Sequence, residues 1–175
     1  TEADREAEKA IRAVIGEVYP DHAILGEEFG RSGEGDLLWV IDPVDGTRPF
    51  ICGVPVWGTL IGLTVKGKAE LGIMSQPYTG ERFWATPDGA WSDGPAGCQP
   101  LQVRDIGNLC DATLFSSAPE LFHPPLRERF QSLVDSVRLT RFGCDCYAFA
   151  MLASGHVDIC VEPGLQPYDI VALTP

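Results

Sequence analysis

The chain has 175 residues, of which 45% are hydrophobic and 22% charged, a composition typical of globular proteins. Twenty-five acidic residues against thirteen Lys and Arg give a formal net charge of -12, so we expect neither nucleic acid nor an acidic membrane as a partner. No apolar run approaches the roughly 20 residues of a membrane-spanning helix.

The first half of the chain is predicted to be a helix followed by a largely antiparallel sheet. Apolar residues recur at three- and four-residue steps from Ala7 to Val18, which indicates an amphipathic helix that ends before Pro20. The apolar runs 23–25 and 37–41 predict strands, separated by a Gly-rich polar loop over 30–35. Further strands are expected at 56–65, 69–74, 81–86 and 90–91.

The pattern changes near residue 108, where short strands begin to alternate with helices. Strands are expected at 114–116, 137–140 and 157–161, and helices at 125–136 and 147–153. Alternation of this kind indicates an α/β layer. We therefore predict two domains, an α+β unit over residues 1–108 and an α/β unit over residues 109–175.

The six cysteines are interpreted as reduced thiols of a cytoplasmic protein. The chain has enough apolar residues to fold without cross-links, and its beginning shows no secretion signal.

Two carboxylates follow directly on the predicted strand 37–41. Asp42 and Asp45 are three residues apart on a predicted turn, in which Gly46 allows an unusual backbone angle. Two acids so placed can aim at one point, as ligation of a hard divalent cation requires. The alternative is that the Asp-Gly pair is simply a turn signal.

A second acidic pair, Glu27 and Glu28, follows the predicted strand 23–25 and would supply ligands from a neighbouring strand. Like charges so close would repel one another strongly. Two Mg²⁺ ions, roughly 3.5 to 4 Å apart as in two-metal phosphoryl-transfer sites, would relieve this repulsion. Such ions would also let a chain of this net charge bind a phosphate ester.

The run from Trp39 to Thr47, the preceding Gly26-Glu27-Glu28 and the distant Pro167-Tyr168-Asp169 together resemble the motifs of the inositol monophosphatase family. The resemblance implies two or three Mg²⁺ ions, with Asp42 bridging two of them. The implied ligands are the side chains of Glu27, Asp42, Asp45 and Asp169 and the carbonyl of Val44.

The resemblance also implies a layered αβαβα sandwich of the fructose-1,6-bisphosphatase and inositol monophosphatase type. A protein of this family would hydrolyse a phosphate monoester with a metal-activated water. The resemblance further implies inhibition by lithium and a homodimer. Glu27, Thr47 and Asp4 would take part in catalysis, although Asp4 also has capping-box spacing from Thr1. The backbone N–H groups of Gly46 and Thr47 would bind the phosphate.

The substrate is predicted from the second half of the chain, which resembles the histidinol-phosphate phosphatase branch. Gly143, Cys144, Asp145 and Glu162 are the expected substrate contacts. The two acids suit a substrate with an amine and an imidazole, because carboxylates pair with cations. The alternatives for these acids are a helix N-cap for Asp145 and a surface charge for Glu162.

Rival functions remain open at this point. Within the family they are an inositol-1-phosphatase or a phosphatase of adenosine bisphosphate. Outside it they are an aspartyl-phosphate enzyme, whose motif is Asp-x-Asp, and a metal-binding module without turnover. Family members extend beyond this chain at both ends, so we expect an open edge in the second sheet. Pro49 departs from the commonest form of the motif.

Overall fold

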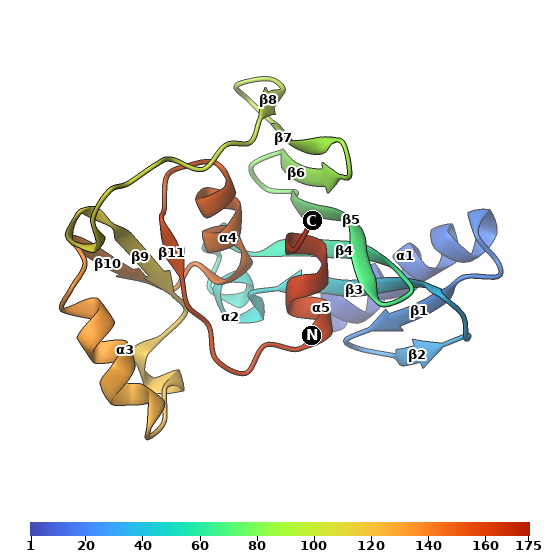
Figure 1. The fold of residues 1–175 in the computed structure, drawn as a ribbon. Helices are drawn as coiled ribbons and strands as arrows, with labels where there is room; N and C mark the ends of the chain where they lie inside the picture. The colour runs from blue at the N-terminus through green and yellow to red at the C-terminus, as the bar shows by residue number, and fades with distance from the viewer.

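A computed structural model describes all residues from Thr1 to Pro175 and contains two β-sheets with helices beside and between them (Figure 1). The larger sheet has the strand order β2-β1-β3-β4-β5-β6-β7-β8 and is antiparallel except for the β1–β3 pair. Its strands are β1 (Ala23–Gly26), β2 (Gly30–Ser32), β3 (Leu37–Asp45), β4 (Gly58–Val65), β5 (Lys68–Gln76), β6 (Glu81–Thr86), β7 (Gly89–Asp93) and β8 (Gln99–Pro100).

Local chemistry explains the tightest turn of this sheet. β4 and β5 are joined by two residues, Lys66 with φ 53° and Gly67 with φ 80°. Positive φ at both positions is the backbone of the two-residue hairpin turns that match strand twist.

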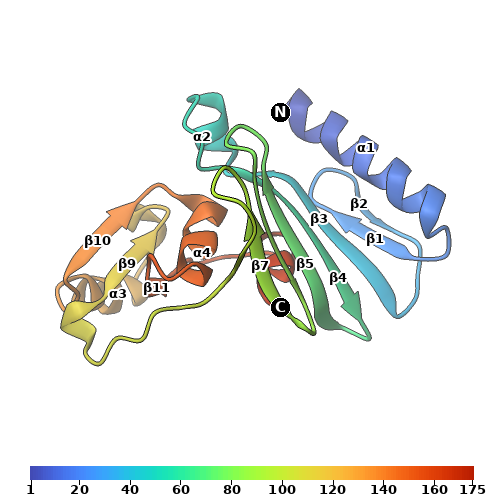
Figure 2. The same cartoon turned by 90° about the horizontal axis from the view of Figure 1, so that it is seen from above.

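Helix α1 (Glu2–Val18) covers one face of the large sheet (Figure 2). Ile15 of the helix is buried against Ile24 of β1 and Ile41 of β3. The helix also buries two acids, Asp4 and Glu8, which lie on the same face as Ile11 and Ile15.

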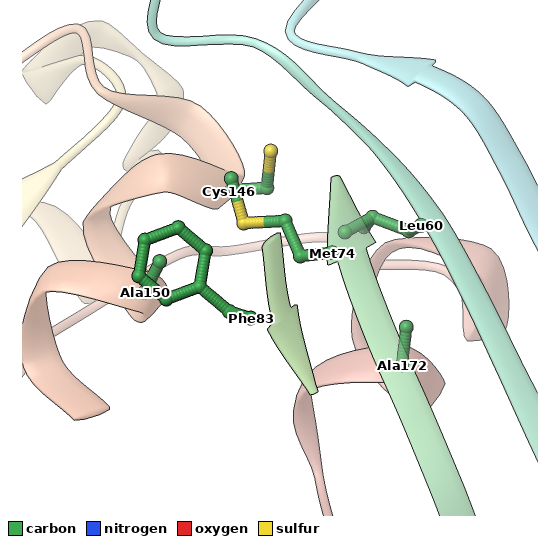
Figure 3. Close-up of a cluster of buried hydrophobic side chains, with 6 residues drawn as sticks. All are labelled: Leu60, Met74, Phe83, Cys146, Ala150 and Ala172. Atoms are coloured by element: carbon green, nitrogen blue, oxygen red, sulfur yellow. The ribbon is translucent and has the colours of Figure 1, made fainter. Parts of the chain in front are cut away.

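The opposite face of the large sheet is covered by α4 (Asp145–Ala153) and by the C-terminal pair α5 (Pro167–Ile170) and η3 (Val171–Leu173). Figure 3 shows the buried cluster that joins these elements: Leu60, Met74 and Phe83 from the sheet, Cys146 and Ala150 from α4, and Ala172 from η3. The approach is very close, since a Cβ on Gly72 would lie 1.9 Å from the Ala172 carbonyl oxygen.

The smaller sheet is parallel, with the order β10-β9-β11. Its strands are β9 (Thr113–Ser116), β10 (Leu139–Phe142) and β11 (Ile159–Cys160). Ile159 packs against the buried cluster that includes Phe130 of α3 (Leu126–Val134), whereas the next residue, Cys160, donates a thiol hydrogen bond to the Ala148 carbonyl of α4. The two helices therefore lie on opposite faces of this sheet.

The resulting layers are α1, the large sheet, α4 with α5, the small sheet, and α3 (Figure 2). This confirms the predicted αβαβα sandwich and places α4 between the two sheets. Shorter elements are α2 (Thr47–Ile51), η1 (Leu109–Asp111) and η2 (Pro119–Leu121). The structure has no helix with the length and hydropathy that crossing a bilayer requires. The division at residue 108 stays a prediction.

Some local predictions differ from the structure, two of them next to the acidic motifs. Residues 30–32 form β2 rather than a loop, and β3 continues to Asp45 instead of ending at Ile41. The sheet register shifts between Asp42 and Asp45, where the strand passes through Pro43. A bulge tolerates the missing proline N–H, so the strand can continue.

Candidate active site

Carboxylates from three separate elements meet at the end of β3. Asp42 and Asp45 of β3 and Asp169 of α5 each offer a carboxylate oxygen within 4.8 Å of the others. Glu27, which follows β1, approaches closely enough that its carboxyl interacts with that of Asp42. The structure thus brings together all four acids named from the sequence.

The electrostatics of this cluster show a shortage of positive charge. Burial raises the pKa of Asp42, which is 2% exposed, and the charges of Asp45 and Glu27 raise it further. Burial also raises the pKa of Asp45 to about 6, although hydrogen bonding to Cys146 opposes the shift. Burial likewise raises the pKa values of Glu27 and Asp169. An all-oxygen donor set of this charge fits hard divalent cations such as Mg²⁺.

The backbone around Val44 belongs to the same centre. The Val44 N–H donates to Asp42 Oδ1 at 3.1 Å and orients that carboxylate. The Val44 carbonyl oxygen lies 3.2 Å from Thr47 Oγ1 and is one of two acceptors within reach of that hydroxyl, the other being Asp4. A carbonyl oxygen has two lone pairs, so one remains for a metal ion.

Thr47 and Asp4 are brought into contact from opposite ends of the N-terminal half. Thr47 Oγ1 lies 3.3 Å from Asp4 Oδ1, and Asp4 is 1% exposed. The other carboxylate oxygen of Asp4 contacts the Thr1 hydroxyl. Thr1 is the N-cap of α1 but makes no side-chain cap hydrogen bond, so the capping-box alternative for Asp4 is wrong, whereas its contact with Thr47 is present. Asp4 also forms a second acidic group with Glu27 and Glu28, with ligand atoms within 4.8 Å of one another.

Asp145 and Glu162 line a recess of about 40 Å³ together with Asp45 and Asp169. Burial raises the pKa of Glu162 to about 7, although its carboxylate accepts a hydrogen bond from the Ser117 N–H. The remaining lining residues are Ser117, Cys146, Phe149 and Leu165. The two predicted substrate acids therefore line the same recess as two of the four metal-site acids, Asp45 and Asp169.

Asp145 adopts a backbone conformation that is uncommon for a residue with a side chain. Its φ is 42°, and a Cβ built on Gly46 would lie 3.2 Å from the Asp145 Cβ. Such strained positions cluster at functional sites. The N-cap of α4 is Cys144 and no side chain caps it, so the alternative role of Asp145 as N-cap is wrong.

Gly143 and Cys144 are not lining residues of this recess. The Gly143 N–H donates to the carbonyls of Ser116 at 3.1 Å and Ser117 at 3.0 Å, and is not free for a ligand. Cys144 is half-buried at the start of α4. Their role as substrate contacts stays a prediction. Gly46 has φ 83° and is the N-cap of α2, as its place in the motif required.

Sequence reasoning missed two residues at this site. Glu8 is fully buried and accepts the Glu28 N–H; its position four residues after Asp4, in line with Ile11 and Ile15, was a usable signal. Arg48 is close enough to lower the pKa of Asp145 against the dominant raising effect of burial. No local pattern joined Arg48 to Asp145.

The layered sandwich and the cluster of carboxylates that could hold a metal ion together define the class of protein. The chain belongs to the inositol monophosphatase family, whose sequence pattern matches it over residues 1–175. This confirms the family suggested by the motifs.

Individual relatives agree with the family. The chain is 42% identical over 178 residues to the bifunctional phosphatase IMPL2, chloroplastic, of Arabidopsis thaliana, covering 100% of this chain and 51% of the relative. It is 38% identical over 178 residues to the histidinol-phosphatase of Chlorobaculum parvum, covering 100% and 67% respectively. It therefore spans about half to two-thirds of the length of these relatives.

Among solved structures, an inositol monophosphatase from Zymomonas mobilis superimposes with a TM-score of 0.89 at 38% identity. The match covers 98% of this chain and 66% of that one. It confirms the predicted fold type.

Proposed function

We propose that this chain carries the catalytic centre of a Mg²⁺-dependent phosphomonoesterase that hydrolyses histidinol phosphate. The observation that carries the proposal is one recess that holds both metal-type acids, Asp45 and Asp169, and the substrate-type acids, Asp145 and Glu162. The similarity to a histidinol-phosphatase supports the same substrate.

The ions would be held by the side chains of Glu27, Asp42, Asp45 and Asp169 and by the Val44 carbonyl. When bound, Mg²⁺ supplies charge neutralisation of the ester oxygens and acidifies water. Thr47 can donate its hydroxyl proton to Asp4, which leaves its oxygen lone pairs free to accept a hydrogen bond from the attacking water. Gly46 and Thr47 are the proposed backbone contacts to the phosphate.

The leaving group is recognised by charge. Histidinol carries an ammonium group and an imidazole, and Asp145 and Glu162 can accept hydrogen bonds from both. A cation in this recess would counter the burial that raises the pKa of Glu162, and would keep the carboxylate ionised. A neutral polyol offers no such charge, so it would leave the half-buried Glu162 without a cationic partner and Asp145 with Arg48 alone.

The experiment is a panel of esters assayed for phosphate release by the purified protein. Histidinol phosphate, inositol 1-phosphate and adenosine 3′,5′-bisphosphate are compared with Mg²⁺, and then with added Li⁺. We expect histidinol phosphate to have the highest kcat/KM and Li⁺ to inhibit its hydrolysis. Preference for inositol phosphate would support the rival suggested by the Zymomonas structure. Mg²⁺ binding by calorimetry without phosphate release from any ester would support the non-catalytic module.

The proposal includes a homodimeric, cytoplasmic enzyme, as the family resemblance implies. Equilibrium sedimentation tests the dimer.

A further inference from the structure

We propose that Glu8 is a positioning residue that holds the Glu27 main chain in place for metal binding. It acts through the backbone of Glu28 and Phe29 and does not bind the metal itself. This inference rests on the proposed function, in which Glu27 is a ligand of Mg²⁺.

The Glu8 side chain is fully buried and its carboxylate accepts three hydrogen bonds. Oε2 accepts the Glu28 N–H at 2.8 Å. Oε1 accepts the Phe29 N–H at 3.4 Å and the Arg12 Nε–H at 2.7 Å. Hydrogen bonds to an ionised group are about twice as strong as neutral ones. The carboxylate therefore ties the loop after β1 to helix α1.

Glu27 lies between two fixed peptide groups. Its own N–H donates to the Ile41 carbonyl of β3 at 3.1 Å, next to Asp42. The following N–H, that of Glu28, is held by Glu8. With the main chain fixed on both sides, the exposed Glu27 side chain is directed towards Asp42.

Arg12 extends the same connection to strand β2. Its Nη1 donates to Ser32 Oγ at 2.9 Å and its Nη2 to the Gly30 carbonyl. The Arg12 side chain is 16% exposed and that of Glu8 0%, so the pair is largely shielded from water. The Glu8–Arg12 pair thus contacts both ends of the turn over residues 27–29: Glu8 binds the Glu28 N–H and Arg12 binds the Gly30 carbonyl.

Gly26 leaves the space that this carboxylate occupies. A Cβ on Gly26 would lie 1.9 Å from Glu8 Oε1 and 2.3 Å from its Cδ. Gly26 has no positive φ, so the backbone angle does not require glycine there. The glycine before Glu27 is thus explained by the room it gives to Glu8.

The test uses Mg²⁺ binding, measured by isothermal titration calorimetry, together with thermal unfolding of the metal-free protein. Glu8→Gln keeps the size of the side chain but loses the charge and one acceptor. We expect its Kd for Mg²⁺ to rise about 10- to 100-fold, the usual cost of losing an outer-shell partner. Activity should need correspondingly more Mg²⁺ and recover at saturation.

Gly26→Ala provides an independent variant, because the added methyl displaces the Glu8 carboxylate without removing its charge. It should weaken Mg²⁺ binding to a similar extent, and the double variant should be no weaker than Gly26→Ala alone. Glu6→Gln is the matched control: Glu6 is an exposed residue of α1 that pairs only with Lys9, so its Kd should stay at the wild-type value.

The outcomes separate the two proposals. If the wild type binds Mg²⁺ and releases phosphate, but Glu8→Gln keeps its Kd within twofold and only melts earlier, Glu8 is merely structural and this inference is overturned. If the wild type neither binds Mg²⁺ nor releases phosphate, the proposed function fails as well. Should Glu8→Gln not fold, Glu8→Asp retains the charge on a shorter stem, and an unchanged Kd there would also overturn the inference.

Discussion

The backbone N–H of Cys146 donates a hydrogen bond to Asp45 Oδ2 at 2.7 Å, joining two residues that are 101 positions apart in the chain. Cys146 lies in the first turn of α4, where free N–H groups favour negative charge. The bond opposes the burial that raises the pKa of Asp45. The acidic centre therefore depends on the large sheet and α4 being packed together.

Replacing Asp42 by Asn should abolish Mg²⁺-dependent turnover and leave the fold intact. The Asn oxygen can still accept the Val44 N–H, but the bridging charge is lost. We expect the rate of phosphate release to fall on the order of a thousandfold. This corresponds to a loss of roughly 4 kcal/mol of transition-state stabilisation by the metal ions. Because burial and the neighbouring acids raise the pKa of Asp42, its metal-free carboxyl favours the neutral form, which Asn resembles, and the metal-free variant should melt no earlier than the wild type. Near-normal turnover at saturating Mg²⁺ would contradict the ligand assignment.

The stability of the metal-free protein should rise as the pH falls from 8 to 5. Burial raises the pKa of Asp45 to about 6 and that of Glu162 to about 7, above the ordinary values near 4. A carboxyl group with a raised pKa binds its proton more tightly in the folded state than in the unfolded state. Its destabilising effect is therefore present above the folded-state pKa and fades as the pH falls below that value. Thermal unfolding with a chelator present measures this.

Saturating Mg²⁺ should flatten this pH dependence, because metal ligation keeps the carboxylates ionised in the folded state. Asp158 does not interfere in this range. Hydrogen bonding to Arg104 lowers its pKa, so its contribution is lost only as the pH falls below its ordinary value near 4. A melting temperature that falls between pH 8 and pH 5 in the absence of metal would show that burial does not raise the pKa values of Asp45 and Glu162.

Charge recognition of the leaving group predicts a selective defect in Asp145→Asn and Glu162→Gln. A charge-assisted hydrogen bond contributes about 1.5–3 kcal/mol, so each variant should raise the KM for histidinol phosphate about 10- to 100-fold. Glycerol phosphate, which has no cationic group, should be hydrolysed with unchanged kcat/KM. Glu128→Gln, an exposed acid on α3, is the matched control. An equal loss for both esters would argue for a structural role.

Two glycine substitutions should have opposite effects on stability, because Gly72 lies in the close contact between β5 and η3 whereas Gly16 faces open space. Gly72→Ala should destabilise the protein by about 1–3 kcal/mol, because the new methyl meets the Ala172 backbone at 1.9 Å. It should also weaken Mg²⁺ binding, since α5, which carries Asp169, directly precedes η3. Gly16→Ala in α1 has open space and should stabilise by about 0.5–1 kcal/mol. Urea unfolding measures both changes, and equal effects would contradict this account of Gly72.

The sequence by itself determined most of the elements and the acids of the centre. Strand β6 was predicted at its observed bounds, and α1, β4 and β5 within a few residues, because periodicity and turn chemistry depend on near neighbours. The placement of Asp42 and Asp45 after an apolar run was equally readable. Gly46 was recognised as a position for an unusual backbone angle, and it has one.

The tertiary structure alone decided which distant groups complete the site. No local pattern predicted three contacts: the hydrogen bond from the Cys146 N–H to Asp45, the packing of the Glu8 carboxylate against Gly26, and the approach of Arg48 to Asp145. The helical spacing of Glu8 indicated its burial but not its partner. The continuation of β3 through Pro43 also depends on its pairing with β4. Such contacts depend on how whole layers pack, and packing is a property of the complete set of buried surfaces rather than of any short segment.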